Sequence, residues 1–309
     1  MMNVSRSGFY KWRSITRHHY RIRREELIED VKRVHEAHKT HGYRWIANYL
    51  RLNEGWQVSD GMVYKCWHYL GLKCESRHQP KKRKKAKKSN KNVAPNLIYS
   101  TWDTVDRPRQ VIVSDMTAFS FNGMYFELTP FFDVFTYEPL TYRVAERRGS
   151  RSQYIDGLED VRKQLIDEPF PVLIHTDQGP VYTSNEFNKL FEPGSKFKRS
   201  MSRVGTPGDN PVHEALNSRI KEELETDFGI KQCRNRQEFL DVIAKYFDYF
   251  KNERPCWAIG YNIPAQYKKM YDDGLLERKD TFEHRVLSEI PKSVQKKKKK
   301  AETQKNDHS

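Results

Sequence analysis

Apolar residues in the first quarter of the chain recur three or four positions apart, which is the spacing of amphipathic helices. This pattern predicts a first helix that begins with the acidic residues from Glu25, where the helix dipole favours negative charge. A second helix is expected over 41–51, and a third over 58–72 with Ser59 as its N-cap and Gly71 at its end. Leu27, Val31, Val34 and His38 recur at helical spacing in the first helix, and Ile46, Tyr49 and Leu50 form an apolar stripe in the second. Three short helices with tight turns predict a helix-turn-helix-like module, although a generic helical subdomain would show the same pattern.

From Gln110 onward the pattern becomes that of strands. Three segments are rich in β-branched and aromatic residues, and Asn122–Gly123 predicts a hairpin turn between the first two. A mixed order of helices and strands follows, with Glu214 on the last predicted helix. The predicted strands are 110–119, 124–135, 139–145, 170–176 and 197–202, and the predicted helices are 152–165, 184–191 and 209–225. This order predicts an α/β layered domain.

Positive charge is concentrated in the flanks of the chain. The 309 residues carry a formal charge of +15, from 56 Lys and Arg against 41 Asp and Glu. Counted along the sequence, residues 1–80 carry +7, 81–93 carry +8 and 291–309 carry +5, whereas 94–290 carry −5. Basic flanks around a mildly acidic centre indicate a polyanionic partner.

Several classes of protein are excluded. No window approaches the roughly 18 consecutive apolar residues of a membrane span, and the N-terminus has no apolar stretch of a secretory signal. The four cysteines are scattered without a CxxC pair, which argues against a disulfide scaffold and a structural zinc site. His35, His38 and His41 could be metal ligands, but a polar helix face is favoured because no cysteine or carboxylate pair lies nearby. We therefore expect a reduced, cytoplasmic protein with no membrane partner.

The segment 79–92 lacks the apolar residues that a core needs, and its like charges repel. We expect a disordered linker that contacts DNA phosphates without sequence preference and adds salt-dependent affinity; a solubilising tether is the alternative. The candidate DNA-binding residues are Lys81, Lys82, Arg83, Lys84 and Lys85. The lysines at 296–300 are expected to form a similar tail.

Three carboxylates stand out by their positions. Asp115 interrupts an apolar strand, Asp177 directly follows another, and Glu214 lies near the start of a helix. A charge in or at the end of an apolar strand is unfavourable unless it is paired, neutralised or bound to a metal. Neighbouring strands could bring the two aspartates together, and three oxygen ligands suit Mg²⁺ or Mn²⁺ better than zinc. Metal-dependent phosphodiester chemistry and ordinary solvated carboxylates both fit this spacing.

Motifs over almost the whole chain carry a family resemblance. They are SRSGFYKW (5–12), HGYRWI (41–46), APNLIY (94–99), SDMT (114–117), HTDQG followed by YTS (175–184), MSRVGTPGDNPVHE (201–214) and YFKNERP (249–255). The chain resembles the second reading frame (OrfB) of bacterial insertion-sequence transposases of the IS-three type, whose catalytic part is similar to retroviral integrase. DQG followed by YTS, with Asp209 and Asn210 shortly before a helical Glu, is a specific combination.

The resemblance implies an RNase H-like core, a mixed five-stranded sheet with flanking helices, that carries a DDE triad. It assigns Asp115, Asp177 and Glu214 as catalytic residues and as ligands of Mg²⁺ or Mn²⁺, with two ions per active site. Lys221 lies two turns after Glu214 on the same helical face and matches a basic residue that contacts DNA. A solvated lysine beside Glu225 is the alternative. The segment 178–213 contains 36 residues, one more than is usual, which a loop over 191–198 could absorb.

The expected organisation is a leader (1–24), a helix-turn-helix-like domain (25–77), a basic linker (78–98), the core with its terminal segment (99–275) and a disordered basic tail (276–309). The resemblance implies a nucleoid-associated bacterial protein that cleaves and joins DNA. Its expected partners are element ends, target DNA, the upstream-frame protein or its frameshift fusion, and further copies of the chain. The alternatives are a catalytically silent DNA-binding accessory or domesticated protein and a plain metal-dependent nuclease.

Overall fold

The computed structural model describes residues 10, 16–75, 92–98, 101–203 and 209–276. The elements below all lie in one compact unit that ends at Asp272. The expected linker residues 78–91, most of the leader and the tail from 277 lie outside the described residues.

Three helices form the N-terminal part of the fold: α2 (Thr16–Ala37), α3 (Tyr43–Asn53) and α4 (Asp60–Tyr69). The residues predicted at helical spacing are buried except Tyr49, which is half-buried. Ser59 caps α4 by accepting a hydrogen bond from the Met62 N–H at 3.3 Å. Gly71 follows α4 with a φ of 64°, as a helix-ending glycine requires. The predicted start of the first helix is wrong, because α2 begins nine residues before Glu25. Arginine has a high helix propensity, so this basic stretch extends the helix without an acidic first turn.

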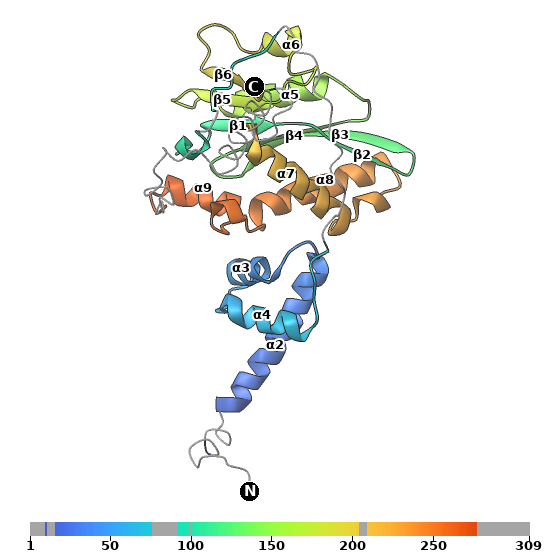
Figure 1. Ribbon diagram of the computed structural model, residues 1–309, viewed down its shortest axis with the longest axis vertical. Coiled ribbons are helices and arrows are strands. Elements are labelled where there is room, and N and C mark those ends of the chain that lie inside the picture. The colour runs from blue at the N-terminus through green and yellow to red at the C-terminus, as the bar shows by residue number, and fades with distance from the viewer. Residues whose placement is uncertain (1–9, 11–15, 76–91, 99–100, 204–208, 277–309) are drawn as a thin grey trace, which may run out of the picture. The chain divides into compact units, whose positions relative to one another are not determined.

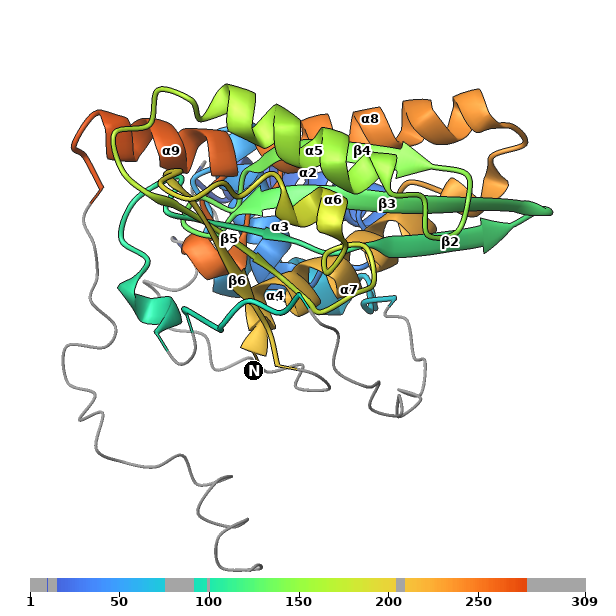
Figure 2. The ribbon, with the colours of Figure 1, turned by 90° about the horizontal axis from the view of Figure 1, so that it is seen from above.

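The sheet has six strands: β1 (Val111–Ser114), β2 (Thr117–Phe121), β3 (Met124–Asp133), β4 (Pro139–Ala145), β5 (Val172–Thr176) and β6 (Phe197–Met201). β3 pairs antiparallel with β1 and β2 and also with β4. β5 pairs parallel with β1, and β6 pairs parallel with β5. The sheet is therefore mixed: β1 to β4 form its antiparallel part, and β5 and β6 extend it in parallel, as expected of an RNase H-like core. The predicted hairpin is confirmed: Asn122 and Gly123 both have positive φ, and β2 and β3 run together to this turn (Figure 2).

The expected single strand over 110–119 is wrong, because it divides into β1 and β2 at Asp115. The Met116 N–H donates to the Asp115 carboxylate at 2.8 Å, so it is not available for a strand ladder. The five-stranded expectation therefore becomes a six-stranded sheet whose break lies at a candidate catalytic residue.

Helices cover both faces of the sheet (Figure 1). α5 (Ser152–Gln164) lies on one face, where the absent side chain of Gly157 makes room for Phe131 of β3. α7 (Pro211–Thr226) and α8 (Arg236–Asn252) lie on the other, where the Phe239 ring of α8 stacks on Phe126 at 3.9 Å. Alternate residues of β3 therefore contact opposite helix layers, and the core fills both sides.

The terminal segment after the helix of Glu214 was expected from the resemblance, but its elements were not predicted. α8 and α9 (Pro264–Asp272) follow that helix, with the short helices η3 (Ile230–Gln232) and η4 (Trp257–Ile259). The predicted helix over 184–191 is only one turn, α6 (Asn185–Asn188), and η1 (Trp102–Thr104) precedes the sheet.

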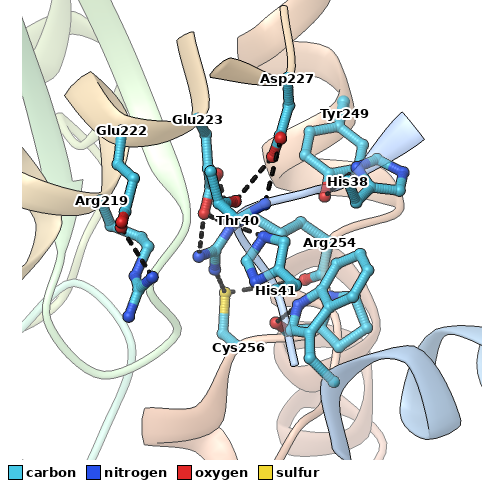
Figure 3. Close-up of polar contacts among 12 residues, drawn as sticks. His38, Thr40, His41, Arg219, Glu222, Glu223, Asp227, Tyr249, Arg254 and Cys256 are labelled. Carbon is cyan, nitrogen blue, oxygen red and sulfur yellow. Dashed lines mark hydrogen bonds and ion pairs between the residues drawn. The ribbon is translucent and has the colours of Figure 1, made fainter. Parts of the chain in front are cut away.

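The segment between α2 and α3 packs against α7 and α8 (Figure 3). Thr40 donates from its N–H and its hydroxyl to the Asp227 carboxylate, at 3.2 and 2.7 Å. His41 Nε2 lies 3.2 Å from Glu223 Oε1, and the His38 ring stacks on Tyr249. We call the residues His38, Thr40, His41, Glu223, Asp227, Tyr249 and Arg254 the docking cluster.

Glu223 is fully buried at the centre of the docking cluster. The Arg254 guanidinium donates to its two oxygens, with the shortest bond at 2.6 Å, and the Tyr246 hydroxyl donates at 3.0 Å. Burial raises the pKa of Glu223, but the charge and hydrogen bonds of Arg254 and His41 outweigh it, so the pKa is lowered. Glu223 is therefore ionised. Its carboxylate links α7 to Tyr246 of α8, to Arg254 just after α8 and to His41 between α2 and α3.

Candidate active site

Asp115 and Asp177 follow the ends of two adjacent parallel strands. The register pairs Val111 with Leu173 and Val113 with His175, an offset of 62 residues in each pair. The same offset relates Asp115 to Asp177, since 177 − 115 = 62. Adjacent strands lie about 4.8 Å apart, so the strands deliver the two aspartates to the same edge of the sheet.

Two buried tyrosines lie near both aspartates. The Tyr182 hydroxyl lies 3.0 Å from the Ser114 hydroxyl, and the Tyr154 ring meets the Tyr182 ring edge to face. Burial raises the pKa of both tyrosines, and the negative charges of Asp115 and Asp177 raise each of them further. Both phenols therefore stay protonated, so the two tyrosines near the carboxylates are neutral.

The loop after β5 fixes the Asp177 carboxylate. The Gly179 N–H donates to Asp177 Oδ1 at 2.8 Å, and Gln178 donates from its amide to the Ser202 carbonyl at 3.0 Å. His175 is fully buried, with its ring nitrogens 2.9 and 3.0 Å from the hydroxyls of Ser200 and Ser202. These contacts tie the Asp177 loop to the end of β6.

α7 brings Glu214 to this edge of the sheet. Asn210 caps the helix by accepting from the His213 N–H, and Pro211 occupies the first turn, where an N–H is not needed. One turn after Glu214, the Asn217 amide donates to Asp115 Oδ2 at 3.2 Å. Glu214 itself is exposed and shares a helical face with Asn217.

His213 is a further neighbour of Asp115. Its side chain is buried, and its Nδ1 lies 3.8 Å from Asp115 Oδ2. Burial and the charge that His175 could carry lower its pKa to about 3, so the ring is neutral. His213 and Asn217 were not predicted from the sequence as neighbours of Asp115. Their spacing around Glu214 on a helix was the available signal.

The candidate carboxylates fit a divalent cation only in part. Asp115 and Asp177 offer hard oxygen donors at one sheet edge, and Asp177 is exposed, so this pair suits Mg²⁺ or Mn²⁺. Within the described residues, no group of three His, Cys, Asp or Glu side chains is placed closely enough to hold a metal ion. The structure therefore brings the two aspartates to one edge with α7 beside Asp115, but it does not gather all three carboxylates into a tight cluster.

Of the residues predicted to contact DNA, the structure describes Lys221 but not those at 81–85. Lys221 is half-buried on α7, two turns after Glu214, and Glu225 lies 2.8 Å from the Lys231 ammonium. Lys81, Lys82, Arg83, Lys84 and Lys85 lie outside the described residues.

The structure also shows the surroundings of the clustered histidines and the state of the cysteines. His35, His38 and His41 are buried against aromatic rings, so the expected polar helix face is wrong. All four cysteines are free thiols. In the part of the chain that the structure describes, no helix has the length and apolar character that a membrane crossing needs.

The sequence matches an HTH-like domain family over residues 23–80. It is 29% identical over 255 residues to the transposase for insertion sequence element IS904 of Lactococcus lactis, covering 80% of this chain and 95% of that protein. It is 27% identical over 270 residues to the InsK protein of IS150 of Escherichia coli, covering 86% and 90%. The HTLV-2 integrase catalytic core solved with magnesium is 16% identical, with 53% of this chain and 97% of that chain covered and a TM-score of 0.41.

Proposed function

We propose that this chain, a homologue of insertion-sequence transposases, is a DDE transposase that uses Asp115, Asp177 and Glu214 to cleave and join DNA. The observation that carries this assignment of residues is the shared register of Asp115 and Asp177 at the ends of adjacent parallel strands. Ordinary solvated carboxylates need no such placement, whereas cation binding by two aspartates requires it.

Asp115, Asp177 and Glu214 would hold Mg²⁺ or Mn²⁺, two ions in the full proposal. When bound, such cations activate the attacking hydroxyl and stabilise the leaving 3′ oxygen. The chain's own residues fix the ligands: Asn217 orients Asp115, and the Gly179 N–H orients Asp177. Neutral His213 adds no positive charge that would compete with a cation for Asp115.

The reaction proceeds in two displacements on phosphorus. Water first attacks a phosphodiester at the element end, the P–O3′ bond breaks, and the 3′ oxygen leaves as a hydroxyl after taking up a proton. That 3′-hydroxyl then attacks a target phosphodiester, and the broken bond there releases a new 3′-hydroxyl. No covalent enzyme intermediate is needed, so positioning and electrostatics supply most of the catalysis.

The remaining assignments follow from this function. We assign 25–77 to a helix-turn-helix-like domain and 99–275 to the catalytic core, with 78–98 and 276–309 as basic linker and tail. Lys221 and the basic residues 81–85 contact DNA. The protein acts on element ends and target DNA in the bacterial cytoplasm at the nucleoid, as a multimer and with the upstream-frame protein or as its fusion.

Substitution of Asp177 by Asn tests the proposal, because it keeps size and removes the charge that a cation needs. A labelled duplex with the element's ends is incubated with Mg²⁺ or Mn²⁺ and either protein, alone and with the upstream-frame protein. We expect joined products from the wild type, a loss of at least about 1,000-fold in the variant, as for removal of a main catalytic group, and equal DNA binding.

Two results would count against this function. Cleaved but never joined products would identify a nuclease. Binding without products under every condition, fused chain included, would identify a silent DNA-binding protein.

A further inference from the structure

A hollow of about 440 Å³ lies beside the docking cluster, apart from the candidate active site. Its walls come from the 40–45 segment, α7 and the turn after Arg254. The volume is within the range of small-ligand sites. Among the described residues that line it, three are arginines and none is acidic: Arg44, Arg219 and Arg254.

Two of these arginines can receive an anion. Arg254 is already neutralised by buried Glu223. Arg44 is exposed beside the Tyr43 ring, with its guanidinium carbon 5.6 Å from the ring centroid. Arg219 is about half exposed and contacts Glu222, whose side chain is 12% exposed, at 2.8 Å (Figure 3), so the exposed half of its guanidinium can face a phosphate. The pocket therefore favours a ligand with negative charge.

Aromatic rings form the opposite part of the wall. Trp257 is 77% exposed, and Tyr261 is half-exposed. Tyr261 has a φ of 65°, which is unusual for a bulky residue, and it follows Gly260 at 68°. Two backbone bonds close this turn, from the Tyr261 N–H to the Cys256 carbonyl and from the Cys256 N–H to the Asn262 carbonyl, each 2.9 Å. The fold thus holds a strained turn that keeps a large aromatic ring in solvent, a combination typical of binding sites.

We propose that this pocket binds an unpaired nucleotide of DNA, with the phosphate between Arg44 and Arg219 and the base stacked on Trp257. Arginine beside exposed aromatic rings is the combination that binds single-stranded nucleic acid, because each base has a face that can stack. Bases in a duplex already stack on one another, so the pocket selects frayed or single-stranded DNA. The inference rests on the proposed action on DNA and adds a second DNA contact outside the triad.

The binding test uses the full chain without metal, so that no cleavage occurs. Fluorescence anisotropy compares a labelled single strand, a blunt duplex and the same duplex with an unpaired 3′ end. We expect Trp257→Ala to weaken binding of the single strand and the unpaired end about tenfold, the order of one stacked base, and to leave the blunt duplex within about twofold. A plot of the logarithm of the single-strand binding constant against the logarithm of the salt concentration has a slope that reports phosphate contacts. Arg44→Ala should make this slope shallower by about 0.7, the value for one phosphate.

Two matched variants control for loss of exposed side chains. Phe170 is 52% exposed just before β5. Arg234 is exposed just before α8, whose 17 residues span about 25 Å and separate it from Arg254. Neither lines the pocket, so Phe170→Ala and Arg234→Ala should bind like the wild type. Equal weakening by these controls, or unchanged binding by Trp257→Ala and Arg44→Ala, would overturn the proposal.

Photocrosslinking gives a second readout. A single strand with 5-iododeoxyuridine should crosslink to the peptide that contains Trp257 and Tyr261, and crosslinks confined to other peptides would contradict the pocket. Asp177→Asn should crosslink normally. A wild type that crosslinks at Trp257 but never joins DNA would refute the transposase function and leave the pocket standing.

Discussion

At Asp177, the direction of a candidate metal ligand depends on a glycine two residues later. The Gly179 N–H holds Asp177 Oδ1 at 2.8 Å, and a Cβ at Gly179 would lie 2.8 Å from the same oxygen. That separation is shorter than a Cβ normally tolerates. The hydrogen bond and a side chain at this position therefore exclude each other.

Gly179→Ala should reduce strand transfer while leaving the fold intact. The new methyl group forces the Asp177 carboxylate to rotate, and we expect a rate loss between about 10- and 100-fold, the range that small misplacements of reacting groups cause. Strand-transfer rates and thermal melting of both proteins measure the effect. Full activity would show that the turn does not set the carboxylate, and a large fall in melting temperature would show a structural role instead.

At the scale of single elements, α5 depends on a glycine for its contact with the sheet. Gly157 is buried, and a Cβ there would lie 2.5 Å from Cε2 of Phe131. Phe131 is fully buried in β3 and has little room to move. The approach of α5 to β3 therefore requires a residue without a side chain.

Gly157→Ala should destabilise the protein by about 1–3 kcal/mol, because overpacking outweighs the better helix propensity of alanine. Gly61→Ala in α4 is the matched control, since Gly61 is exposed and the nearest atom to its Cβ is 3.9 Å away. The control should be neutral or stabilise by up to about 1 kcal/mol. Chemical denaturation measures both changes. Equal effects of the two substitutions would contradict the packing argument.

Local signals predicted the elements that local chemistry determines. The Asn122–Gly123 hairpin and the Ser59 cap each depend on a few neighbouring residues and form as predicted. The break of the first strand at Asp115 was missed, because an apolar run does not reveal where a side chain replaces a ladder hydrogen bond. The two candidate aspartates could be proposed from the sequence because a charge beside an apolar strand is visible there.

The parts that were missed depend on distant contacts. α8 has apolar residues at helical spacing, but its position on the sheet depends on contacts with residues distant in sequence, such as the stacking of Phe239 on Phe126. Buried His38 and His41 were predicted to lie on a polar face. The ring that covers His38, Tyr249, is distant in sequence, and nothing marks the nearby Trp45 as the partner of His41. Glu223 carried a usable signal: it continues the apolar stripe of Leu216 and Ile220, and a charge on such a stripe indicates a buried partner.

At the scale of the whole molecule, titratable groups of the docking cluster make its stability depend on pH. Burial, the neighbouring His41 and the Arg254 charge lower the pKa of His38 to about 4, and Glu223 opposes them only in part. Burial likewise lowers the pKa of His41, against the effect of Glu223. Burial raises the pKa of Asp227 to about 6, despite its hydrogen bonds from Thr40. On acidification, the histidines therefore lower the stability of the folded protein, whereas Asp227 raises it.

Stability should fall as the pH is lowered from 7 to 5. The unfolded chain protonates its histidines near pH 6.5, whereas folded His38 stays neutral down to about pH 4, so each such histidine removes at most about 1.4 kcal/mol per pH unit. Asp227 takes up its proton near pH 6 when folded and near 3.9 when unfolded, so it adds stability over the same range. Two histidines outweigh one carboxylate, and the net change is a loss.

Thermal melting at pH 7 and pH 5 measures this fall, and Asp227→Asn separates the two contributions. The amide keeps an oxygen for the Thr40 hydroxyl but cannot be protonated, so the variant should lose stability more steeply than the wild type. A melting temperature that is constant between pH 5 and 7, or a shallower change in the variant, would contradict the assignment.

Helix α7 carries Glu214 near its beginning and Glu223 near its end, nine residues later. Each added residue turns a helix by 100° and lengthens it by 1.5 Å. An insertion or deletion between these positions would turn the Glu214 or the Glu223 side chain away from its partners. The turn over 192–195, which precedes β6, can change in length without moving the pairing of β6 with β5. We expect related chains and laboratory-made length variants to gain or lose residues in that turn, and to keep the count between Glu214 and Glu223 unchanged.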